Sequence, residues 1–144
     1  MKVAILSAGS SLRDFLPFNP APFDVVVAVN DAATLAPWHH WAAFDKPLSA
    51  FQAKFPEWER VDWGPEFLEA NSPTFPRGPR YTLPMTLEAV QQVYKPTQIH
   101  CFGVDMSGER LDGEVCKAGR WAIEEEHLRR LDLSRVQWFG KWRP

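Results

Sequence analysis

The stretch KVAILSAGSSL, residues 2–12, decides the fold class of this chain. Residues 3–6 form a continuous apolar run, which is typical of a strand buried on both faces of a parallel sheet. The small residues after it predict a tight turn, and Ser10 or Ser11 is placed to cap a short helix that runs through Leu16. We therefore expect this segment to be the first strand and turn of an α/β domain.

The rest of the chain alternates apolar strands with short helices. The expected strands are residues 24–29, 41–44, 98–102 and 135–139, and the expected helices are residues 32–36, 48–55, 82–95 and 120–131. The helix at 82–95 has Thr82 as its expected cap and Pro84 in its first turn, where a missing N–H is tolerated. This order predicts a single three-layer α/β domain over residues 1–144, Rossmann-like, with a mostly parallel sheet and helices on both faces.

A proline-rich insertion interrupts this alternation at residues 56–80. Five prolines punctuate it, and we expect it to be irregular apart from a short strand near residues 61–63. It is either a surface loop or a semi-rigid lid that brings Arg77 or Arg80 over a bound phosphate.

Composition excludes several classes of protein. With 144 residues, of which 45% are hydrophobic and 24% charged, the chain is not intrinsically disordered as a whole. It has no apolar run of 18 residues, so no membrane span is expected, and its net charge of −2 does not favour general nucleic-acid binding. Cys101 and Cys116 lack metal-ligand spacing, and the first apolar run is too short for a signal peptide, so we expect a cytoplasmic protein.

Polar residues follow four of the expected strands. They are Gly9, Ser10 and Ser11, then Asn30 and Asp31, then Asp45, and finally Gly103 and Asp105. Ligands bind open parallel sheets at the carboxyl ends of the strands. The backbone N–H groups of the first turn suit a phosphate, and Asn30 or Asp31 suits a ribose. The alternative is that these residues serve only as caps and turn formers.

Asp45 and Asp105 are also candidates for a catalytic base or for ligands of a shared divalent cation. Two carboxylates do not define a metal site, so we assign no metal ligand, and Mg²⁺ dependence stays open.

The last expected helix carries a polar stripe beside its apolar face. Arg120, Glu124 and His127 recur at i, i+4 and i+7. Arg120 suits a phosphate or carboxylate, with Glu124 or His127 as acid or base. The alternative is a structural ion pair. Two further pairs, Glu125 with Arg129 and Glu126 with Arg130, are expected to face solvent.

The positions of the other histidines favour roles in packing over roles in catalysis. His39 and His40 precede the third expected strand, which places them at the amino edge of the sheet, away from the expected site. His100 lies within a strand and is expected to belong to the core or to a sheet face.

Several strand ends together resemble a known domain. They are GSSL (9–12), AVND (28–31), WAAFD (41–45), FGVD (102–105) and an Arg-Trp-x-x-Glu helix start at 120–124. This pattern resembles the Rossmann-like domain shared by bacterial sialyltransferases of the Campylobacter type and the motility-accessory or pterin-diphosphokinase-like domains. It is also similar to small proteins of tailed phages and prophages, which implies a bacterial cell or a phage-infected host.

The resemblance implies that Gly9, Ser10, Ser11 and Asn30 hold a CMP-type nucleotide. The chain departs from the family at Ser7 and Ser10, which stand where the family turn has Gly and Pro. None of the four histidines matches the catalytic histidine of the sialyltransferases.

Three hypotheses about function follow. The first is a nucleotide or nucleotide-sugar binding protein, or a minimal glycosyltransferase-like enzyme. The second is a non-catalytic, phage-encoded accessory module that binds a protein partner through exposed tryptophans, among them Trp38, Trp58, Trp63 or Trp142. The third is a phosphotransferase for a pterin or another small heterocycle, which would need Mg²⁺ at Asp45 and Asp105.

Overall fold

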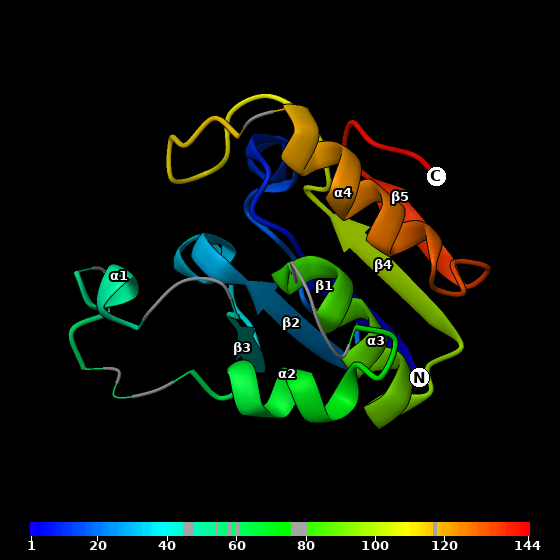
Figure 1. Cartoon of the computed structure of the whole chain (residues 1–144). Coiled ribbons are helices and arrows are strands. Elements are labelled where there is room, and N and C mark those ends of the chain that lie inside the picture. Colours follow the sequence, from blue (N-terminus) through cyan, green and yellow to red (C-terminus); the bar gives the residue numbers. More distant parts are fainter. Residues whose placement is uncertain (45–47, 54, 58, 60, 76–80, 117) are drawn as a thin grey trace.

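A computed structural model describes residues 1–44, 48–53, 55–57, 59, 61–75, 81–116 and 118–144 (Figure 1). The strands are β1 (Lys2–Leu6), β2 (Val25–Val29), β3 (His40–Ala42), β4 (Gln98–Phe102) and β5 (Val136–Phe139). The helices are α1 (Ser49–Gln52), α2 (Pro65–Asn71), α3 (Thr82–Tyr94) and α4 (Ala118–Arg129), with 3-10 helices η1 (Ser10–Phe15) and η2 (Asn30–Thr34).

The five strands form one parallel sheet in the order β3-β2-β1-β4-β5. The chain runs outward from β1 to β3, returns through α3 to β4 on the other side of β1, and then continues outward to β5. This is the order of a doubly wound sheet, with its reversal between β1 and β4. The predicted single α/β domain with a parallel sheet is confirmed.

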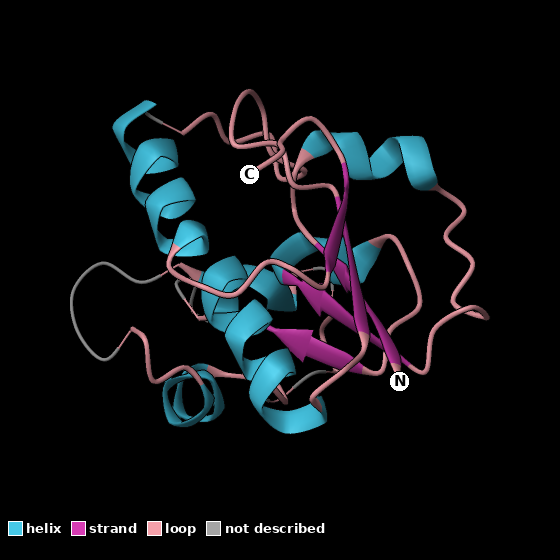
Figure 2. Cartoon of the chain, turned by 90° about the vertical axis from the view of Figure 1, so that its right-hand side faces the viewer, coloured by secondary structure: helices cyan, strands magenta, loops and turns pink. Residues whose placement is uncertain are grey.

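The apolar strands bury side chains on both faces, as continuous apolar runs require. On one face Val3 and Ile5 pack with Leu87 of α3 and Leu128 of α4. On the other face Leu6 packs in a second core, with residues of η1, η2 and α1. Seen from the side, the strands lie between a layer of longer helices and a thinner layer (Figure 2).

The insertion differs most from its prediction. Residues 65–71 are helical, so the expectation of an irregular segment is wrong there. Pro65 occupies the first turn of α2, where its missing N–H leaves no bond unmade. The short strand expected near 61–63 is a single bridge, in which Trp63 pairs with Ala42 beyond the edge of β3. Arg77 and Arg80 of the proposed lid lie outside the described residues.

Two predicted helix caps are also wrong. Tyr81, not Thr82, is the N-cap of α3, and the Thr82 hydroxyl accepts a hydrogen bond from the Phe44 N–H at 3.1 Å. Gly9 is the N-cap of η1, and neither Ser10 nor Ser11 caps it with a side chain. In both cases the serine or threonine hydroxyl at the start of the helix does not cap that helix.

Smaller differences concern element boundaries. The third strand spans residues 40–42 rather than 41–44, α1 covers only residues 49–52, and the helix expected at 32–36 is the 3-10 helix at 30–34. The last helix begins two residues earlier than expected, at Ala118. No described helix is both long enough and apolar enough to cross a lipid bilayer.

Candidate functional site

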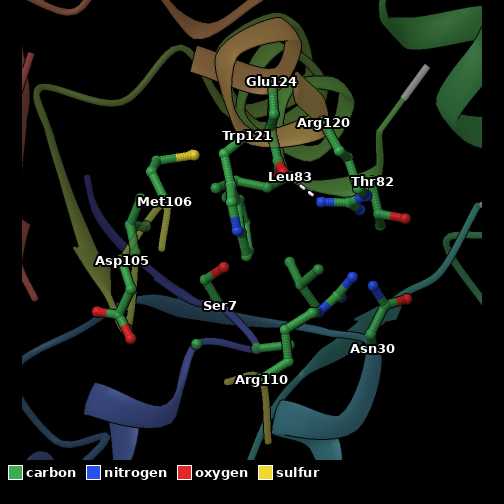
Figure 3. Close-up of a pocket in the computed structure, with 15 residues that line it drawn as sticks. Ser7, Asn30, Thr82, Leu83, Asp105, Met106, Arg110, Arg120, Trp121 and Glu124 are labelled. Atoms are coloured by element: carbon green, nitrogen blue, oxygen red, sulfur yellow. Dashed lines mark hydrogen bonds and ion pairs between the residues drawn. The ribbon is translucent and has the colours of Figure 1, made fainter. Parts of the chain in front are cut away.

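A pocket lies at the carboxyl ends of β1, β2 and β4, where the strand order reverses (Figure 3). We call it the switch-point pocket. The described residues that line it are Ser7, Ala8, Gly9, Val29, Asn30, Thr82, Leu83, Gly103, Val104, Asp105, Met106, Arg110, Arg120, Trp121 and Glu124. Its free volume is only about 30 Å³, which is room for about two water molecules.

Two glycines bring the ends of β1 and β4 together beneath the pocket. The Gly9 N–H donates to the Gly103 carbonyl at 3.1 Å, and a Cβ on Gly9 would lie 2.2 Å from that oxygen. Gly103 has a φ of +77°, and a Cβ there would meet Leu12 and Ser7 at 2.9 Å. Only glycine allows so close an approach in this conformation.

Asp105 lines the pocket, but its carboxylate holds this floor together. Its carboxylate accepts hydrogen bonds from the Ser11 N–H at 3.0 Å, from the Ser11 hydroxyl, and from the Lys141 N–H at 3.2 Å. Figure 3 shows the carboxylate turned away from the other labelled side chains. Asp105 is therefore placed to join the first turn, the end of β4 and the segment after β5, rather than to act on a ligand.

The first turn offers less to a phosphate than its sequence indicates. The N–H groups of Gly9 and Ser11 are both engaged inside the protein, with Gly103 and Asp105 respectively. Gly9 lines the pocket, but Ser10 and Ser11 are not among its described lining residues. The groups best placed for an anion are therefore side chains from elsewhere in the chain.

Asn30 lines the pocket from the end of β2. It has a φ of 49° and is 2% exposed, and its backbone carbonyl accepts from the Trp41 indole N–H at 3.0 Å. The side-chain oxygen Oδ1 is buried without a hydrogen-bond partner among the described residues. A buried acceptor of this kind costs free energy unless a ligand or water donates to it. Asp31 is buried next to it in η2 but is not among the described lining residues.

Arg120 and Glu124 form the ion pair that their spacing predicts. The Arg120 Nη1 lies 2.8 Å from the Glu124 Oε2, and Glu124 is buried. The guanidinium also stacks over two rings, at 4.4 Å from the centroid of Tyr81 and 5.3 Å from that of Trp121. These contacts fix the orientation of Arg120, which therefore loses little conformational entropy on binding a ligand.

Arg110 is the charged lining residue that sequence reasoning missed. It lies in the polar segment between β4 and α4, yet it is only 8% exposed. Its guanidinium points toward the same space as that of Arg120, beside the Asn30 side chain (Figure 3). No local pattern marks Arg110, because its inward direction follows from an antiparallel bridge to Gly9, far away in the sequence.

His127 is buried but is not among the described lining residues. Its ring packs against Phe75 and Tyr81, with centroids 5.2 and 5.8 Å away, and its Nδ1 has no partner within the described residues. Burial lowers the pKa of His127 below its usual value, the positive charge of Arg130 lowers it further, and Glu126 opposes the shift. Its packing therefore favours the neutral form of the ring.

The other predicted residues fall outside the pocket. Asp45 lies outside the described residues. His100 packs among Phe23, Phe102 and Phe139, as expected of a sheet-face histidine. Cys101 and Cys116 are free thiols, and burial raises the pKa of Cys101. Within the described ranges, no group of three or more His, Cys, Asp and Glu side chains is arranged to hold a metal ion.

Comparisons with protein families, with curated proteins and with solved structures found no match to this chain. The functional argument therefore rests on the geometry of the switch-point pocket.

Proposed function

We propose that the protein binds a nucleotide or nucleotide sugar in the switch-point pocket. One observation carries this proposal: two arginine side chains and a buried asparagine converge at the reversal point of a parallel sheet. Guanidinium groups suit phosphate oxygens because they donate two parallel hydrogen bonds. In this proposal Arg110 and Arg120 bind the phosphate, and Asn30 accepts a hydrogen bond from a ribose hydroxyl.

The narrow pocket has to open before a nucleotide can enter it. A volume of about 30 Å³ admits water but no nucleoside, so side chains at its mouth must move. The Trp121 ring projects into the space between Met106 and the two arginines (Figure 3). In the opened pocket this indole would form a flat wall for a base or a sugar.

Glycosyl transfer is a narrower form of the proposal. It would need a base for the acceptor hydroxyl, and Glu124 is the lining carboxylate beside Arg120. Glu124 is paired with Arg120, which favours a charge-balancing role over proton abstraction. The geometry thus supports binding more directly than transfer.

The protein-binding alternative has less support. Its hypothesis needs exposed tryptophans, but Trp63 and Trp142 are buried and Trp38 is half-buried. Trp58 lies outside the described residues. The large hydrophobic side chains that are exposed include Leu35, Val93 and Val115, which come from separate elements.

A thermal-shift panel tests the proposal. The panel contains CMP, CDP, UMP, UDP, GDP, ATP, NAD, CMP-sialic acid and a pterin, each with and without Mg²⁺. A ligand at about 100 times its dissociation constant adds about 2.7 kcal/mol of stability, which raises the melting temperature by several degrees. We expect a shift with one class of nucleotide in the wild-type protein.

Arg120→Gln should lose that shift, and Arg120→Lys should recover part of it, because lysine keeps the charge but not the planar fork. Arg130→Gln is the matched control, since Arg130 lies on the same helix but pairs with Glu126 in solvent. A panel in which no compound shifts the wild-type protein would contradict the proposal.

A further inference from the structure

The segment 107–116 contributes Arg110 to the lining of the switch-point pocket, and we call it the strap. Between Ser107 and Cys116 the buried residue is Arg110, and Val115 is 71% exposed. An arginine is an unusual residue to bury from an exposed loop, because removing its charge from water costs free energy unless charged or polar partners compensate. Arg110 is therefore the buried side chain of the strap, and it is a cation, while Leu111 is partly buried and packs against the second core.

The strap is a small unit bonded mostly within itself. The Arg110 N–H donates to the Glu114 carbonyl at 2.9 Å, the Gly113 N–H donates to the Arg110 carbonyl at 2.9 Å, and Glu109 pairs with Val115. These bonds close a hairpin over residues 109–115.

The strap is attached to the body by hydrogen bonds and by the packing of Leu111 against the second core. Leu111 donates its N–H to the Ala8 carbonyl at 2.9 Å, Arg110 pairs with Gly9, and the Arg13 side chain reaches the Leu111 carbonyl at 3.4 Å. All three contacts lie next to the first turn, so movement of the hairpin would break them together with the packing of Leu111.

The residues where the strap begins form its hinge. Met106 and Gly108 both have positive φ, 54° and 72°, and a Cβ on Gly108 would meet nothing within 4 Å. Met106 is buried in the core, whereas Gly108 lies in open space and can rotate without collision. Rotation at Gly108 would carry Arg110 away from the pocket.

We propose that the strap is a gate that closes Arg110 onto the phosphate of the bound ligand, opposite Arg120. This inference rests on the proposed function and deepens it, because it names the recognised group as a phosphomonoester or diphosphate. Both guanidinium groups line the same narrow space, and each suits the oxygens of a phosphate because it donates parallel hydrogen bonds. A nucleoside without phosphate gains nothing from either arginine.

Calorimetric titrations test the ligand class. Inorganic pyrophosphate, CMP and cytidine are titrated into wild-type protein, Arg110→Gln and the control Arg130→Gln. We expect pyrophosphate and CMP to bind the wild type and cytidine to bind at least tenfold more weakly. Arg110→Gln should weaken phosphate binding by about 10- to 100-fold, as expected for losing a hydrogen bond between charged groups, and Arg130→Gln should change it less than twofold.

Hydrogen exchange of the wild-type protein tests the gate without any variant. Amides of residues 107–116 should exchange more slowly in saturating pyrophosphate, while those of α2 should not change. Binding of CMP that Arg110→Gln leaves intact would overturn the inference and leave the proposed function standing. Weaker binding by Arg110→Gln with unchanged strap exchange would overturn the gate, and a wild type that binds none of the phosphates would overturn both.

Discussion

Two clusters of polar side chains lie at opposite ends of the sheet and differ in what their polar atoms face. At the carboxyl end, the switch-point pocket gathers Arg110, Arg120, Glu124 and Asn30 around a small space. At the amino end, His40 at the start of β3 joins Asp62 and Tyr94 in what we call the edge cluster.

The polar groups of the edge cluster form hydrogen bonds with one another. Asp62 accepts from the His40 Nδ1–H at 2.7 Å and from the Trp41 N–H at 2.7 Å, and the Tyr94 hydroxyl donates to the His40 Nε2 at 2.6 Å. The His40 ring also stacks on Trp63 at 4.9 Å. Burial, and then the negative charge of Asp62, raise the pKa of Tyr94, so its hydroxyl stays protonated as a donor.

The difference separates a structural cluster from a binding site. Every group of the edge cluster has its partner inside the cluster, so these bonds tie the insertion to β3 and α3. In the switch-point pocket, by contrast, the Asn30 oxygen is buried without a partner among the described residues. Polar residues alone therefore do not mark a site, whereas polar atoms that face a shared space do.

The largest expected effect comes from the floor of the pocket. Gly9→Ala forces a Cβ to within 2.2 Å of the Gly103 oxygen, and such overpacking should destabilise the protein by about 3 kcal/mol. Urea denaturation measures this loss. Gly119→Ala is the control, because a Cβ there meets nothing within 4 Å and alanine favours the helix. Equal stability of Gly9→Ala and wild type would refute the close approach of β1 and β4.

The next largest effect concerns Asp105. Asp105→Asn should cost about 2 kcal/mol, because an amide hydrogen-bonds poorly with two donors from Ser11 and leaves one of them unpaired. Asp132→Asn is the control, an exposed carboxylate that accepts from the Ser134 N–H. The free energy of unfolding from urea titration decides the matter, and similar losses in both variants would rule out the role given to Asp105.

A smaller effect is the dependence of stability on pH. Burial lowers the pKa of both His100 and His127 in the folded state, with Lys2 and Arg130 adding to the shifts. The unfolded chain then binds protons more readily than the folded one once the pH falls below about 6.5. Stability should be fully present at pH 7.5 and decrease toward pH 5.5, above the range where the lowered carboxyl pKa values of Glu125 and Asp132 act.

Urea midpoints at the two pH values measure this dependence. The decrease should be smaller in His127→Gln than in the wild type, because glutamine does not titrate. A variant that loses as much stability as the wild type between pH 7.5 and 5.5 would show that His127 is not the source.

The smallest effect is expected in the edge cluster. Tyr94→Phe removes the hydroxyl that donates to His40 and should cost about 1 kcal/mol. Tyr81→Phe, the control, keeps the ring that stacks with Arg120 and should change stability little. Limited proteolysis should cut the insertion faster in Tyr94→Phe than in Tyr81→Phe, and no difference would weaken the comparison between the two clusters.

The sequence correctly predicts those features that depend on interactions between residues close together in the chain. The continuous valine-rich run predicts β2 because a strand buried on both faces has no polar position to fill. The i, i+4 spacing likewise predicts the pair of Arg120 with Glu124 and the two solvent-facing pairs on α4. These features involve neighbours along the chain.

What local sequence misses depends on distant partners. Arg110 points into the pocket because its backbone forms a bridge with Gly9. The Asp105 carboxylate is turned away from the pocket because it accepts hydrogen bonds from Ser11. Helix α2 is missed for another reason, since Pro65 stops a helix in its interior but is tolerated in the first turn. Which of these applies depends on the packing of Leu68 in the core, which no local pattern reveals.

The most direct measurement compares the two clusters for nucleotide affinity. It is the dissociation constant of the nucleotide that gives the largest thermal shift, measured by calorimetry for wild type, Arg120→Gln and Tyr94→Phe. Our account predicts a loss of at least tenfold in Arg120→Gln, as for a charged hydrogen bond removed, and no change in Tyr94→Phe. Equal affinities in all three proteins, or a larger loss in Tyr94→Phe, would contradict it.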